Sequence, residues 1–180
     1  MVNLQRITTE YVEVEDRIRI SGEDEQAQTI ALWLTQRLLS QVILHLLGLI
    51  EKQSPTLGRA ESTPAASSSL MQGFAQQAAE AELRPELPVK TASSSQSWLV
   101  REIDISLSPE GALLLVFKRD PGSVEQQAER GKARVTVEAK QLRQWLAIVR
   151  AQWQRAAWPS TLWPAWMDEL PASGKSNPLH

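Results

Sequence analysis

Tryptophan is concentrated near the C-terminal end of this chain of 180 residues. Five of the seven tryptophans lie at or after position 145, namely Trp145, Trp153, Trp158, Trp163 and Trp166. A large aromatic ring removes on the order of 150–250 Å² from water when it is covered, so rings are rarely left exposed. The tail that carries them is broken by Pro159 and Pro164. These rings must therefore cover another surface.

Two surfaces would meet this need. The tail folds back over its own helix, or it presents the group Trp158, Trp163, Trp166 and Met167 to a partner. Aromatic residues and methionine are enriched at protein interfaces, where a few such anchors supply most of the binding energy. We predict a non-enzymatic protein-interaction or assembly module that uses these four residues to bind a protein partner or a second copy, as a homodimer.

Basic residues at helical spacing suggest a different chemistry. Lys140, Arg143 and Arg150 lie in one predicted helix together with Trp145. Cations beside an aromatic ring are suited to single-stranded nucleic acid, because they pair with phosphates while bases stack on the ring. The formal net charge of −2 favours instead a solvated helix face. Nucleic-acid binding is therefore the alternative function.

The sequence lacks the residues that several kinds of metal site and catalytic site require. The chain has no cysteine and only two histidines, His45 and His180, which removes thiolate metal sites and cysteine nucleophiles. His45 has no histidine or carboxylate three or four residues away, so we expect a structural histidine. The acidic residues of the first 28 positions lack the spacing of a calcium loop. We predict no catalytic residues, no metal site and no cofactor.

The first half of the chain predicts three strands and a helix. Residues 11–21 alternate between apolar and polar types, which indicates a hairpin. A loop of Glu15, Asp16 and Arg17 would place Val14 opposite Ile18, so that apolar side chains face each other. A third strand over 29–34 follows, and Thr35 then caps a helix over 36–53. We assign 1–53 to this half.

The rest of the chain divides into a linker, a second half and the tail. Residues 54–97 are rich in Ser, Ala, Pro and Gln, which is typical of a mostly disordered linker. Within it, residues 70–83 have few apolar anchors, so we expect no more than a transient helix there. Residues 98–158 predict a strand over 99–107, a turn at 108–111, strands over 112–118 and 133–138, and a helix over 139–158 that Pro159 ends. Residues 159–180 form the Trp/Pro-rich tail.

The two halves share one order of elements, three strands and then a helix. The fold class that follows is α+β, in which two β-β-β-α halves form one antiparallel sheet of about six strands with two long helices on one face. This order is similar in outline to the Whirly and Pur-type nucleic-acid-binding folds, although no sequence motif accompanies the likeness.

The most apolar segment, residues 30–50, contains Arg37 and His45, so we predict no membrane span and a cytoplasmic protein.

Overall fold

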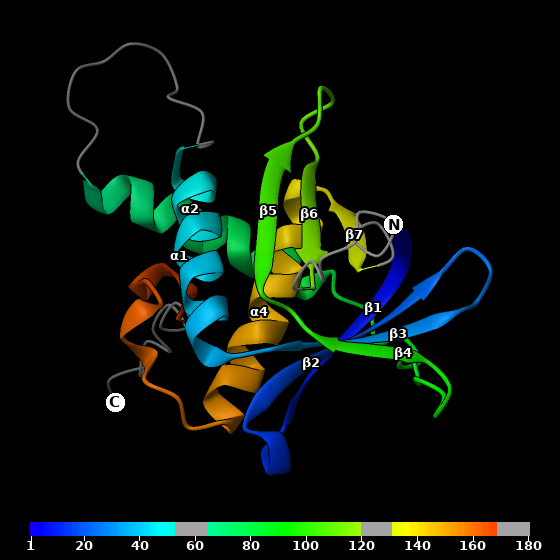
Figure 1. The fold of residues 1–180 in the computed structure, drawn as a ribbon. Helices are drawn as coiled ribbons and strands as arrows, with labels where there is room; N and C mark the ends of the chain where they lie inside the picture. Colours follow the sequence, from blue (N-terminus) through cyan, green and yellow to red (C-terminus); the bar gives the residue numbers. More distant parts are fainter. Residues whose placement is uncertain (53–64, 120–130, 169–180) are drawn as a thin grey trace, which may run out of the picture.

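The computed structural model describes residues 1–52, 65–119 and 131–168, and Figure 1 shows them as an α+β fold. The first half has the predicted order: strands β1 (Val2–Val12), β2 (Arg17–Asp24) and β3 (Thr29–Leu34) form an antiparallel meander, and helix α1 (Gln36–Lys52) follows directly. The backbone N–H of Leu38 donates to Oγ1 of Thr35 over 3.3 Å. The predicted cap of α1 is therefore confirmed.

The register of the first hairpin differs from the prediction. Tyr11 lies opposite Ile18 and Glu10 opposite Arg19, because residues Glu13–Glu15 form a short 3-10 turn and lengthen the loop. Val14, expected to face Ile18, is 92% exposed in this turn. Arg19 still finds an acid across the strands, since its guanidinium pairs with Glu10 at 2.7 Å. An acidic and a basic side chain are thus paired across the two strands at the observed register.

The second half repeats the order of the first. Strands β5 (Glu102–Leu107), β6 (Leu113–Lys118) and β7 (Lys132–Val137) form a second antiparallel meander, and helix α4 (Ala139–Arg155) follows. The turn between β5 and β6 is the predicted one: Gly111 has a φ of 85° and its N–H donates to the carbonyl of Ser108 over 2.9 Å. A positive φ is the conformation that glycine adopts without strain.

The two meanders join into one mixed sheet of seven strands, and not into an antiparallel sheet of six. The strand order is β4-β3-β2-β1-β7-β6-β5, where β4 is Gln96–Leu99, and the pairs β1·β7 and β3·β4 are parallel. The reason is topological. A meander of three strands has outer strands that run in the same direction, so two meanders in the same orientation meet through parallel pairs.

The sheet curls until its two edge strands meet. Strands β4 and β5 lie at opposite ends of the sheet order, yet only Val100 and Arg101 separate them in the chain. The N–H of Val100 donates to the carbonyl of Trp33 on β3, and the N–H of Arg101 donates to the carbonyl of Lys118 on β6, both over 2.9 Å. One extended segment thus passes from one edge of the sheet to the other.

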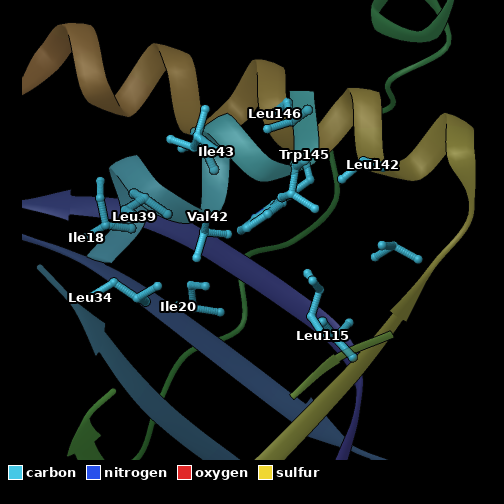
Figure 2. Packing of buried hydrophobic residues seen from close by; sticks show 14 of the residues in the cluster. Ile18, Ile20, Leu34, Leu39, Val42, Ile43, Leu115, Leu142, Trp145 and Leu146 are labelled. Atoms are coloured by element: carbon cyan, nitrogen blue, oxygen red, sulfur yellow. The ribbon is translucent and has the colours of Figure 1, made fainter. Parts of the chain in front are cut away.

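The core lies between the curled sheet and the helices α1 and α4. Figure 2 shows side chains of β2, β3 and β6 facing those of both helices. Each of these two helices buries one stripe, in α1 the residues Leu39, Val42, Ile43, Leu46, Leu47 and Ile50, and in α4 the residues Leu142, Trp145, Leu146, Val149 and Trp153. Both stripes repeat at three and four residues, as an amphipathic helix requires.

A third helix, α2 (Ala65–Ala81), lies within the stretch that the sequence predicted to be a linker. It packs against α4 and the C-terminal tail, and the segment that follows leads to β4. Residues 65–97 therefore belong to the fold, while residues 53–64 of the predicted linker lie outside the described residues. The sequence predicted only a transient helix over 70–83 that does not dock, because the face that α2 buries carries amides and small residues instead of apolar ones.

Candidate interaction site

The C-terminal tail turns back at the end of α4. Ala157 has a φ of 53°, its N–H donates to the carbonyl of Gln154, and the N–H of Trp158 donates to that of Trp153. These two bonds around a left-handed residue make a Schellman cap. Pro159 then accepts a hydrogen bond at its carbonyl from Nε1 of Trp153, over 3.0 Å. The cap and the proline direct the tail back along its own helix.

Aromatic rings fix the start of the tail. Trp153 meets Trp158 edge to face with centroids 4.8 Å apart, and it meets Trp163 in the same way at 6.0 Å. Nε1 of Trp158 donates to Oδ1 of Asp16 over 3.1 Å, and the same oxygen accepts from the hydroxyl of Tyr11 over 2.9 Å. This hydrogen bond from Tyr11 is the main reason why the pKa of Tyr11 is raised. The tail and the first hairpin thus share one carboxylate.

The end of the described tail lies against α1 and α4. Nε1 of Trp166 donates to Oε1 of Glu51 at the end of α1, over 3.2 Å. The guanidinium of Arg143 lies 5.8 Å from the centroid of the Trp166 ring, a cation–π distance. Arg150 donates to the carbonyl of Met167 and pairs with Asp168. Each contact ties the tail to its own chain.

The four residues predicted to form the interaction surface are thus packed within the chain. Trp158, Trp166 and Met167 are buried, and Trp163 is half-buried. Of the two possibilities that the sequence left open, the described tail follows the first and covers its own helices. Residues 169–180 of the predicted tail lie outside the described residues.

The residues predicted to bind nucleic acid are also engaged in internal contacts. Lys140 pairs with Glu82 at 2.8 Å, and this hydrogen bond is the main cause of its raised pKa. Arg143 is half-buried beneath α2, where burial lowers its pKa, and it donates to Oε1 of Gln72. The indole Nε1 of Trp145 donates to Oγ1 of Thr9 over 3.0 Å, away from solvent. The structure does not present this group as one open cationic face.

Helix α2 carries the apolar surface that the sequence did not predict. Its inward face is polar: Nε2 of Gln76 donates to the carbonyl of Arg143 over 3.0 Å, and Gln144 donates to the carbonyl of Ala79 over 2.9 Å. Its outward face carries Leu70, Met71 and Phe74, which are 47%, 60% and 54% exposed. We call these three residues the α2 stripe. Their spacing of one, three and four residues was the available signal.

Other candidate chemistry is sparse in the described part of the chain. No group of three or more histidine, cysteine or acidic side chains among the described residues is placed to hold a metal ion. His45, which the sequence predicted to be a structural histidine, is exposed on α1. No described helix combines the length and the apolar character that crossing a membrane requires.

Comparison with known proteins does not assign the chain to a family. No protein-family model matches the chain, and neither a curated protein nor a solved structure gives a match. The outline likeness to Whirly and Pur-type folds therefore receives no support from solved structures, and the site is interpreted from its own geometry.

Proposed function

We propose that the chain is a non-enzymatic assembly module that forms a homodimer through the α2 stripe. The observation that supports this proposal is the reversed polarity of α2, which buries Gln72 and Gln76 and leaves Leu70, Met71 and Phe74 in water. A helix that packs only on its own domain places its apolar residues inward. An exposed apolar stripe of this kind is typical of a surface with a partner.

The shape of the stripe favours a second copy of the same helix. Phe74 lies near the middle of the 17 residues of α2. A two-fold axis at Phe74 would place Leu70 of one copy against Ala78 of the other, so that large side chains meet small ones. Ala78 is exposed and therefore available for this contact.

Charge is also compatible with an antiparallel pair. Glu80 is the only charged residue between 65 and 81, so two copies of the stripe bring no like charges together at the centre. In the antiparallel pair, Glu80 near the C-terminal end of one helix lies beside the N-terminal end of the other. A carboxylate is stabilised there by the positive end of the helix dipole.

The Trp-rich tail contributes by supporting the helix from beneath. Its short helix η3 (Ala165–Met167) packs against α2, and Arg143 contacts both Trp166 and Gln72. In this proposal the predicted residues Trp158, Trp163, Trp166 and Met167 position the interface without forming its outer surface.

Light scattering coupled to size-exclusion chromatography tests the dimer over a range of protein concentrations. A pair of single helices is at the small end of interface sizes, so we expect a dissociation constant of roughly micromolar order. The double variant Leu70→Gln/Phe74→Gln should be monomeric with an unchanged melting temperature. Leu107→Gln, which changes an equally exposed leucine on β5, should remain dimeric. A wild-type chain that is monomeric at about millimolar concentration would refute the proposal.

A further inference from the structure

A separate groove lies where strands β1 and β7 diverge. The two strands pair only over Val2–Leu4 and Ala133–Val135, although β1 continues to Val12 and β7 to Val137. Helix α4 and residues 82–89, which we call the strap, line the space between them. The groove is open to solvent on one side and has a volume of about 770 Å³, within the range of roughly 300–1,000 Å³ that small-molecule sites occupy.

Two features of the structure mark the ends of the groove, which is open to solvent between them. At one end, the β1·β7 pairing stops at Leu4 and Val135. At the other end, the hydrogen bond from Trp145 to Thr9 closes the gap. Thr9 lies five positions after Leu4 on β1, which corresponds to about 16 Å of strand. These dimensions favour an elongated small molecule over an added peptide strand, which needs an open edge.

The strap is fastened to both walls of the groove. Nζ of Lys140 on α4 lies 2.8 Å from Oε2 of Glu82 at the start of the strap. Near its end, the carbonyl of Leu87 accepts from Arg6, and the N–H of Val89 donates to Oγ1 of Thr8, both over 2.8 Å. The strap is therefore held at both ends along one side of the groove.

The lining combines apolar walls with one unpaired cation. The apolar lining residues include Ile7, Val89, Val135, Val137, Trp145 and Ile148, while Leu83 and Leu87 of the strap are largely exposed to solvent. The charged ones comprise three cations and two anions, of which Lys140 pairs with Glu82, and Arg6 with Glu86 at 3.7 Å. Arg84, which is exposed on the strap, is the one left without a partner among the described residues. The lining thus carries one net positive charge beside apolar surface.

We propose that this groove binds a small molecule with an extended apolar chain and a single carboxylate, which pairs with Arg84. The apolar chain would lie along Ile7 and Ile148, where it displaces water from apolar surface. A planar guanidinium matches a carboxylate with two parallel hydrogen bonds. This site is distinct from the α2 stripe, so the two proposals stand or fall separately.

Isothermal titration calorimetry with decanoate, kept below its micelle concentration, tests the proposal on the full chain. We expect one binding site per chain. Decyltrimethylammonium has the same chain length and the opposite charge, and it should bind at least tenfold more weakly. Equal binding of the two compounds would overturn the proposed role of the cation, and the absence of decanoate binding would overturn the site.

Variants locate the site. Arg84→Gln should weaken decanoate binding about tenfold, as expected for loss of a charged hydrogen-bond partner, and Arg84→Lys should recover part of the loss. Arg37→Gln removes the same charge from the exposed face of α1 and should have no effect. Ile148→Trp, with folding verified by circular dichroism, should block the groove. Loss of binding in the Leu70→Gln/Phe74→Gln variant would instead assign decanoate to the α2 stripe and refute the groove.

Discussion

Replacement of Trp166 by alanine distinguishes a tail that belongs to the core from a tail that serves only as an interface. The ring is 6% exposed, and its burial removes about 200 Å² from water, worth at most about 5 kcal/mol at ~25 cal/mol per Å². Core Trp→Ala changes cost about 3–5 kcal/mol. Because Trp166 lies near the end of the described chain, where neighbours can collapse into the space, we expect about 3 kcal/mol.

Urea unfolding followed by circular dichroism, at several protein concentrations, measures this loss. For a chain of this size, a loss of 3 kcal/mol lowers the melting temperature by roughly 6–12 °C. Trp33→Ala is the matched control: Trp33 is half-buried on the sheet, and its Nε1 donates to Ser97, so a smaller loss of about 1–2 kcal/mol is expected. A loss below about 1 kcal/mol for Trp166→Ala, or one that appears only at concentrations where the chain dimerises, would contradict an intramolecular role.

Two further predictions concern Ala157, in the turn that ends α4, and Tyr11, whose hydroxyl is bonded to the turn of the first hairpin. Ala157→Gly should raise the free energy of unfolding by about 0.5–1 kcal/mol, because glycine adopts the φ of 53° without the clash of a Cβ atom; a lower urea midpoint would contradict this. The hydrogen bond to Asp16 raises the pKa of Tyr11 above 10.0, so its contribution to stability is complete below pH 10.0 and is lost as the pH rises further. Tyr11→Phe should therefore lose less stability than the wild type in thermal unfolding across this alkaline range, and equal losses would show that the bond does not contribute.

Local signals in the sequence were sufficient for the elements that begin or end at a chemically distinct residue. Thr35 marks the start of α1 because its side chain satisfies a free N–H of the first turn. Pro159 marks the end of α4 because it has no N–H to continue the helix, although the last helical residue is Arg155 and not Trp158. The physical effect of a cap or a proline reaches only a few residues, so it can be predicted from the local sequence.

Features that depend on distant residues were not predicted. The register of the first hairpin follows from a turn whose Asp16 is held by Trp158, 142 positions later in the chain. The parallel pairs of the sheet join strands that are far apart in the chain, β1 with β7 and β3 with β4. Rules for strand pairing that consider one hairpin at a time cannot predict contacts between residues so far apart in the chain.

The polarity of α2 and the position of the tail both relate to one half-buried cation. Arg143 lies half-buried on α4, and its charge requires acceptors. Gln72 on α2 accepts from it on one side, and the ring of Trp166 lies against it on the other. A helix that supplies amides to such a residue turns its leucine, methionine and phenylalanine outward. The surface proposed for dimerisation therefore follows from how α2 covers Arg143, and the tryptophan tail completes that cover from the opposite side.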